Sequence, residues 1–241
     1  MCLIGVALGA STRFPLVLAA NRDEFFVRPT LGAHWWNDHP DVLAGRDLRA
    51  GGTWLGVTRT GKLAAVTNIH RPNASEGTIS RGDLVTAFLN NSMSASEYTT
   101  HVLQQRKQYS PFNLFVCAGS RASYLNQDGD CVKLDDGVHA ISNTPIGDDW
   151  PKTRLMREGL TSALHSEDIS GALLELLSTE GSDATPADLQ TDLFIRGKQF
   201  GTRSTTVVVV SNDGMIHFTE RQFDAGANVQ QEVRFRVPLE Q

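Results

Sequence analysis

The run from Thr205 to Val210 constrains the fold more than any other part of the chain. It reads Thr-Thr-Val-Val-Val-Val, so every side chain in it is β-branched. β-branched residues favour extended backbone, and a mostly apolar run without alternation is typical of a strand that is buried on both faces. The run therefore predicts a central strand, and with it a core built around a β-sheet.

Other short apolar runs bounded by turn residues predict the partners of this strand. Arg59-Thr60-Gly61 and Asn212-Asp213-Gly214 are turn sequences of the kind that joins antiparallel neighbours. The predicted strands are Leu3–Leu8, Pro15–Ala19, Trp54–Thr58, Lys62–Thr67, Phe112–Ala118, Ser123–Asn126, Cys131–Leu134, Val138–Ser142 and Met215–Phe218.

Helix signals lie between these strands. Ser94 and Glu97 form a capping box, and Pro151 suits the first turn of a helix. The predicted helices start at Ser80 and span Ser94–Gln108, Lys152–Leu164 and Asp168–Leu177, while Ser178–Gly201 reads as a long surface loop. No repeat or shift in composition divides the 241 residues, so we predict one α+β domain spanning residues 1–241.

Composition excludes several classes of protein. The formal net charge of −5 gives no basic footprint for nucleic acid, and no apolar run approaches the roughly 20 residues of a membrane span. No cationic segment precedes the apolar N-terminus as in a secretory signal. The three cysteines lack the paired spacing of a zinc site or of covalent haem attachment. We expect a cytoplasmic protein without a metal site.

Cys2 is the sharpest candidate for chemistry. A small side chain after Met1 permits removal of the initiator methionine, which would make Cys2 the N-terminus. A free N-terminal cysteine carries both a nucleophilic thiol and an α-amine with a pKa of about 7.7–8.0. A cysteine in second position is, however, usually without function.

Polar groups at strand ends supply further candidates. Asn21, Arg22, Asp23 and Glu24 follow an apolar strand directly. Asn68 and Asn143 each end a predicted strand, where a side-chain amide can donate to a developing oxyanion, although asparagine is equally a turn residue. Arg203 enters the most apolar strand and requires a partner there, for which a carboxylate such as Asp23 is suited.

The glycine pair Gly51-Gly52 before Trp54 indicates a close approach of the backbone to a neighbour or a ligand. The spacing of a phosphate-binding loop is missing around it.

Taken together, these strings resemble the NRDE family, also called the transport and Golgi organisation protein 2 family. The resemblance runs in order along essentially the whole chain. It rests on Met1-Cys2-Leu3-Ile4, Leu18–Phe25, Arg28-Pro29, His34-Trp35-Trp36, Val42–Asp47, Gly51–Val57, Ser80-Arg81-Gly82, Phe112-Asn113-Leu114, Ser142-Asn143, Trp150-Pro151-Lys152 and Gly201–Ser204.

The resemblance implies an N-terminal-nucleophile (Ntn) hydrolase-like fold, a four-layer αββα sandwich with antiparallel sheets. More distantly, the chain is similar to the choloylglycine hydrolase and penicillin V acylase group of cysteine amidases. Their nucleophile, their Asn-x-Asp, their two oxyanion asparagines and their late arginine correspond here to Cys2, Asn21-Arg22-Asp23, Asn68, Asn143 and Arg203. The chain departs from that group in carrying Ala20 where those amidases have an arginine, and its own arginine is Arg22.

Two functions fit these residues. The first is an N-terminal cysteine hydrolase of a small amide or thioester, which needs no cofactor. The alternative is a non-catalytic trafficking protein that binds haem, an acyl-CoA-like molecule or lipid, as the family suggests. The expected ligand contacts in either case are Glu24, Phe25, Trp54, Trp36 and His34, with His39 and His70 as further iron-ligand candidates. The sequence leaves the oligomeric state open.

Overall fold

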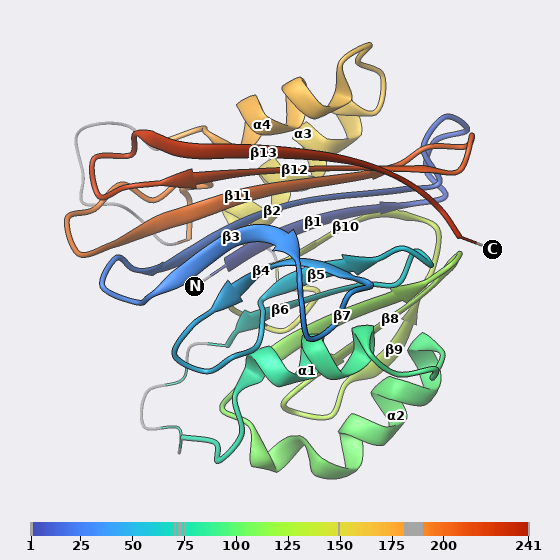
Figure 1. The fold of residues 1–241 in the computed structure, drawn as a ribbon, viewed down its shortest axis with the longest axis vertical. Helices are drawn as coiled ribbons and strands as arrows, with labels where there is room; N and C mark the ends of the chain where they lie inside the picture. Colours follow the sequence, from blue (N-terminus) through green and yellow to red (C-terminus); the bar gives the residue numbers. More distant parts are fainter. Residues whose placement is uncertain are drawn as a thin grey trace. The chain divides into compact units, whose positions relative to one another are not determined.

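The computed structural model describes residues 2–69, 71, 74, 76–148, 150–180 and 190–240. The chain divides into two compact units. Unit 1 comprises residues 1–28, 136–141 and 146–238, and unit 2 comprises residues 29–135, 142–145 and 239–241. Each unit contains one antiparallel sheet and two of the α-helices (Figure 1). The prediction of a single domain stays a prediction.

Unit 1 is built on a six-stranded sheet with the strand order β10-β1-β2-β11-β12-β13. Its strands are β1 (Cys2–Leu8), β2 (Leu16–Phe25), β10 (Gly137–Ile141), β11 (Phe200–Val210), β12 (Met215–Phe223) and β13 (Val229–Pro238). The predicted central strand is confirmed, because β11 lies between β2 and β12 and every residue from Ser204 to Val210 is buried.

Helices α3 (Pro151–Ala163) and α4 (Ile169–Leu177) pack on one face of this sheet (Figure 1). Pro151 is the first residue of α3, and the Asp168 carboxylate caps α4 at the N–H of Gly171, both as predicted. The core between the helices and the sheet includes Met156 and Val207.

Unit 2 is built on a seven-stranded sheet in which strands β3 to β9 pair in sequence order. They are β3 (Thr30–Trp35), β4 (Val42–Asp47), β5 (Leu55–Thr58), β6 (Leu63–Asn68), β7 (Phe112–Ala118), β8 (Arg121–Asn126) and β9 (Cys131–Leu134). This order follows from short antiparallel connections, which join neighbours along the chain.

Helices α1 (Arg81–Leu89) and α2 (Ala95–Gln105) cover one face of the second sheet, and a short 3₁₀ turn, η1 (Arg106–Gln108), follows α2. The capping box of Ser94 and Glu97 is confirmed. The close approach predicted at Gly52 is also found, because a Cβ at this position would lie 2.7 Å from the carbonyl carbon of Gly82 at the start of α1.

The sequence-based prediction is wrong for part of the long surface loop. In the described part of Ser178–Gly201, which omits residues 181–189, Leu193, Phe194 and Ile195 are buried. Three strands, β3, β4 and β13, were not predicted from the sequence. No helix in the described ranges has both the length and the apolar character needed to cross a membrane.

Candidate functional site

Cys2 is the first residue of β1 and pairs directly with Arg22 of β2. Residues opposite each other in an antiparallel pair project from the same face of a sheet, so the sulfur and the guanidinium lie on one face. Both side chains are buried, and Arg22 forms an ion pair with Glu24 at 3.7 Å. The sheet thus places a cation beside the predicted nucleophile.

Several groups act on the pKa of the Cys2 thiol. Burial is the largest effect and raises the pKa, because the thiolate loses its hydration. The carboxylate of Asp23 also raises it, whereas the charge of Arg22 and a hydrogen bond from the backbone N–H of Asp23 lower it. Burial dominates, so the thiol form is favoured, although the positive charge of the N-terminus, Arg22 and the Asp23 N–H all lower the pKa.

Asp23 is buried and follows Arg22, the residue that pairs with Cys2. Because side chains alternate along a strand, the Asp23 side chain projects from the face of β2 opposite to Arg22. The hydroxyl of Thr202 donates to its carboxylate at 2.7 Å and accepts from the N–H of Ile195 at 2.9 Å. Burial raises the pKa of Asp23, while Thr202 and the cations of Lys152 and Arg22 lower it. The carboxyl is therefore held in one orientation by Thr202.

Asn21 shares its sheet face with Leu3, on the helix side of the sheet. Its amide nitrogen donates to the carbonyls of Leu177 and Leu193, both at 2.8 Å, and its oxygen accepts from the Thr205 hydroxyl. All of these partners lie on the face opposite to Cys2. Asn21 thus joins the end of α4 to strand β2, and its predicted catalytic role stays a prediction.

Arg203 lies at a β-bulge of β11, between the residues that pair with Asp23 and Arg22. The expected carboxylate partner is wrong: its guanidinium donates to the carbonyls of Phe25, Phe26 and Arg28, each at 3.1 Å. The bulge re-aims the side chain along the strand, toward the turn that follows β2. Arg203 therefore holds that turn together.

Glu24 and Phe25 end strand β2. Besides its ion pair with Arg22, Glu24 accepts from the N–H of Phe25 at 2.8 Å. The Phe25 ring is 53% exposed and meets the ring of Phe200 edge-on at 5.3 Å. This turn offers accessible apolar surface.

Asn68 and Asn143 come together in unit 2. Asn68 is the last residue of β6, and the side-chain amide of Asn143 donates to its carbonyl at 2.9 Å. Asn143 is buried, and it follows Ser142, whose carbonyl accepts from the Thr67 hydroxyl. The structure thus brings the two predicted oxyanion residues together. Their convergence on Cys2 stays a prediction.

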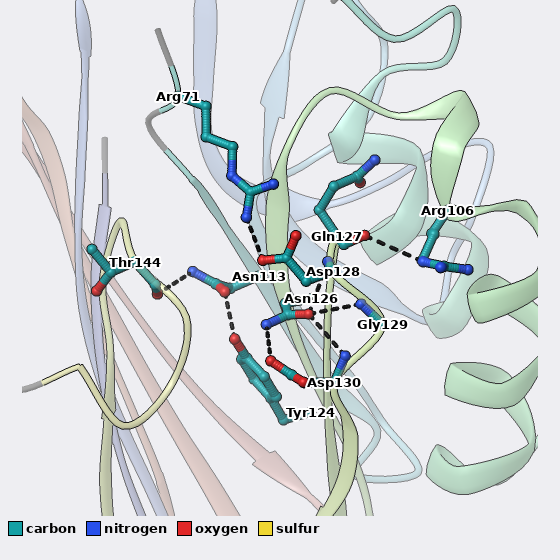
Figure 2. Close-up of polar contacts among 10 residues, drawn as sticks. All are labelled: Arg71, Arg106, Asn113, Tyr124, Asn126, Gln127, Asp128, Gly129, Asp130 and Thr144. Atoms are coloured by element: carbon teal, nitrogen blue, oxygen red, sulfur yellow. Dashed lines mark hydrogen bonds and ion pairs between the residues drawn. The ribbon is translucent and has the colours of Figure 1, made fainter. Parts of the chain in front are cut away.

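Asn113 of β7 holds the segment that carries Asn143 (Figure 2). Its amide nitrogen donates to the Thr67 hydroxyl at 3.0 Å and to the carbonyls of Ser142 at 3.0 Å and Thr144 at 2.9 Å. Its oxygen accepts from the Tyr124 hydroxyl at 2.5 Å. Asn113 is buried, so losing these bonds would leave unsatisfied polar groups in the core.

Asn126 is the cross-strand partner of Asn113 and organises the β8–β9 hairpin (Figure 2). Its oxygen accepts from the N–H groups of Asp128, Gly129 and Asp130, each at 3.0 Å. The residue opposite Asn113 thus fixes the turn of this hairpin through three backbone hydrogen bonds.

The remaining predicted ligand contacts also belong to unit 2. Trp36 is fully buried, donates to the carbonyl of Ala44 at 3.1 Å and carries Arg46 over its ring. The ring of Trp54 packs on Gly45, where a Cβ would lie 2.4 Å away. Nδ1 of His34 lies 2.7 Å from the carbonyl of Gly32. Trp36 is therefore a core residue.

No group of three metal-ligating side chains occurs among the described residues, and His70 lies outside them.

Sequence reasoning missed three residues around these sites: Lys152, Thr202 and Asn113. The signal for Asn113 was present, since it is a polar residue inside an otherwise apolar strand. Nothing in the pattern of α3 marks Lys152, because a lysine in a first helical turn is ordinarily exposed, whereas Lys152 is 1% exposed.

Solved structures identify the fold. An N-acylethanolamine-hydrolyzing acid amidase ortholog from Caenorhabditis elegans aligns with a TM-score of 0.53 and 13% identity, covering 87% of this chain and 92% of that one. The C2A mutant of conjugated bile acid hydrolase from Clostridium perfringens aligns with a TM-score of 0.55 and 11% identity, covering 98% and 92%. The predicted fold class, α+β of Ntn-hydrolase type with antiparallel sheets, is confirmed.

Sequence relatives identify the family. The human Transport and Golgi organization protein 2 homolog is 31% identical over 238 residues, covering 86% of each chain. Transport and Golgi organization protein 2 of Drosophila melanogaster is 25% identical over 265 residues, covering 91% of each. A profile of the Transport and Golgi organisation 2 family matches residues 1–225. The chain belongs to this family.

Proposed function

We propose that the protein is an N-terminal cysteine hydrolase that cleaves a small amide or thioester in the cytoplasm. The observation that carries the proposal is the position of Cys2 at the start of β1, directly opposite Arg22 and within hydrogen-bonding reach of the Asp23 backbone. A thiol held beside a cation and a backbone donor can be stabilised as the reactive thiolate.

The reaction begins once removal of Met1 has freed the α-amine of Cys2; Met1 itself lies outside the described residues. The amine takes the proton of the thiol, and the thiolate forms a bond to the carbonyl carbon of the substrate. The tetrahedral intermediate collapses and expels an amine or a thiol, which takes the proton back from the α-ammonium. Water then hydrolyses the acyl-cysteine, releases a carboxylic acid and restores the thiol.

Further side chains of the chain would act with Cys2 in this reaction. Arg22 favours the thiolate, and Asp23, held by Thr202, orients the α-amine. Asn68 and Asn143 donate to the oxyanion, an interaction worth about 3–4 kcal/mol at the transition state. Arg203 supports the site through the turn after β2.

The fold supports this proposal because both aligned structures carry hydrolase names, and one is a C2A mutant. Identities of 13% and 11% transfer the fold alone, so the activity and the substrate rest on the residues of this chain.

The test combines the intact mass of cell-derived protein with labelling by a thiol-reactive acyl probe. Cys131 is exposed and would compete for the probe, so the assay uses a Cys131→Ser background. Cys117 remains as an internal control, because burial raises its pKa to about 12. We expect a mass without Met1 and acylation that Cys2→Ala abolishes. Retained Met1, or equal labelling in Cys2→Ala, excludes the hydrolase.

The second candidate is a carrier of haem or of an acyl-CoA-like or lipid ligand on the same fold. The raised pKa of the Cys2 thiol favours it, because a protonated thiol is a weak nucleophile. The exposed Phe25 ring offers apolar contact, and the bond between Nδ1 of His34 and Gly32 leaves Nε2 for an iron ligand. A haem titration of wild type and of His34→Ala tests the haem carrier. A haem absorbance band that appears in wild type and is lost in the variant supports it, whereas the absence of a band in wild type excludes it.

A further inference from the structure

The cross-strand ladder that pairs Cys2 with Arg22 continues across two more strands of unit 1. Arg22 also pairs with Ser204 of β11, and Ser204 pairs with Gln222 of β12. Because directly paired residues share a face, these four side chains form one polar row on the face that carries the Cys2 sulfur. We call Cys2, Arg22, Ser204 and Gln222 the nucleophile row.

Ser204 brings a buried, unsatisfied hydroxyl to this row. Its side chain is 3% exposed, and its hydroxyl has no hydrogen-bond partner among the described residues. A buried hydroxyl without a partner costs about 1–3 kcal/mol, so native proteins seldom keep one unless a ligand or water satisfies it. The neighbouring hydroxyl of Thr206 is satisfied, since it lies 3.3 Å from the carboxylate of Glu220.

Two charged side chains of opposite sign, Arg22 and Glu220, lie beside Ser204 on the same face of the sheet. Arg22 is paired with Glu24 at 3.7 Å, and Glu220 accepts from Thr206 and from the Gln222 amide at 3.3 Å. A charged ligand group of either sign would therefore lie near a like charge, which adds to the cost of its desolvation. An uncharged amide avoids that cost, and its carbonyl oxygen can accept a hydrogen bond from the Ser204 hydroxyl.

We propose that Ser204 forms a subsite for an uncharged amide group of the substrate, separate from the bond that Cys2 attacks. Neighbouring strands lie about 4.7–4.9 Å apart, so Ser204 is roughly 10 Å from Cys2 across two strand spacings. The substrate would therefore carry a second amide at roughly that distance from the scissile carbonyl. This inference rests on the proposed function, because it takes Cys2 as the reacting group.

The test compares two acyl thioesters of equal length. One has an acetamido group roughly 10 Å from the thioester carbonyl, and the other has a plain alkyl chain there. The rate of Cys2 acylation is measured by intact mass for wild type, Ser204→Ala and the matched control Thr206→Val. The Ser204 hydroxyl has no hydrogen bond to lose, so Ser204→Ala is expected to fold with an unchanged or higher melting temperature.

We expect Ser204→Ala to lower the rate ratio of acetamido to alkyl thioester by about tenfold, the value of one hydrogen bond to a neutral group. The alkyl rate should stay the same, and Thr206→Val should keep the wild-type ratio. An unchanged ratio in Ser204→Ala overturns the subsite and means that water alone satisfies the hydroxyl.

Failure of the hydrolase would be distinguishable. If neither thioester acylates Cys2 in wild type, the same pair is made with a non-reactive ketone, and the rise in melting temperature is measured. If the acetamido ketone raises the melting temperature of wild type more than the alkyl ketone does, and this difference is lost in Ser204→Ala, the subsite is supported even without the reaction. An equal rise with both ketones, or an undiminished preference in Ser204→Ala, overturns it.

Discussion

Arg22 lies directly across the β1–β2 ladder from Cys2 and lowers the pKa of its thiol against the opposing effect of burial. These are two of several effects that together decide how much thiolate is present near neutral pH. A buried cation in this place has a cost of its own, which Glu24 partly offsets through its ion pair. The arrangement therefore makes Arg22 one of the groups on which the reactivity of Cys2 depends.

Replacing Arg22 by glutamine is expected to raise the pKa of Cys2 further. Each pKa unit reduces the thiolate about tenfold, so alkylation by iodoacetamide should slow at neutral pH and its pH profile should move to higher pH. Rates are measured on a Cys131→Ser background. Arg13→Gln, an exposed substitution in the same unit, is the control and should match wild type. Equal rates for Arg22→Gln and wild type would falsify the role of this arginine.

Replacing Asp23 by asparagine is expected to stabilise the protein at neutral pH. The pKa of Asp23 in the folded protein is raised above its ordinary value of 3.8. Between these two pKa values the folded state binds more protons than the unfolded state, so the stability of the protein falls as the pH rises. Asparagine removes this penalty and can still accept from Thr202. The gain is therefore expected to grow as the pH rises above 3.8 and to be complete above the folded pKa.

The gain from Asp23→Asn should vanish below about pH 4, where the carboxyl is protonated in both states. Urea unfolding at a series of pH values measures it. Asp213→Asn is the matched control, for which the opposite effect is expected. The Ser211 hydroxyl lowers the pKa of the exposed Asp213 carboxyl, so replacing this carboxylate should lower the stability of the protein at neutral pH. A neutral-pH loss of stability in Asp23→Asn would contradict the prediction.

The strands that sequence alone predicts are those with uninterrupted apolar runs. Thr205–Val210 is the clearest case, and its central position follows from burial on both faces. β3 was missed because Gly32 and His34 break its pattern, and β4 ends in Gly45-Arg46-Asp47. β13 was missed although Val233, Phe235 and Val237 alternate with polar residues, which is the expected pattern of a half-exposed strand.

The sequence predicts which residues belong to the candidate site better than it predicts the contacts that these residues make. The sequence puts its arginine at position 22 rather than 20, and the register of the β1–β2 pair shows that Arg22 lies opposite Cys2 on the same face. The register itself depends on how the 9–15 connection closes, which turn residues alone do not specify. Arg203 could not be assigned a partner from sequence, because a β-bulge at its position redirects the side chain.

Replacing Asn113 by leucine is expected to destabilise the protein by about 2–4 kcal/mol, since three acceptors lose a donor and the buried Tyr124 hydroxyl loses an acceptor. Because Asn113 holds the segment that carries Asn143, the proposed hydrolysis should fall as well. Tyr124→Phe keeps the Asn113 amide in place and should cost only about 1–2 kcal/mol. Chemical denaturation compares the two, and a smaller loss in Asn113→Leu than in Tyr124→Phe would show that the network does not hold this segment.

Replacing Gly52 by alanine is expected to cost about 1–3 kcal/mol, because its Cβ would lie 2.7 Å from the Gly82 carbonyl carbon and 2.9 Å from the oxygen. Both are backbone atoms at the start of α1, so the whole helix end must shift. Gly51 is the matched control: its φ of +82° is tolerated by asparagine, and open space surrounds its Cβ position, so Gly51→Asn should cost less than about 1 kcal/mol. Urea unfolding measures both. Equal losses of stability in the two variants would mean that the start of α1 shifts at little cost. The glycine pair would then be needed only for the conformation of the turn.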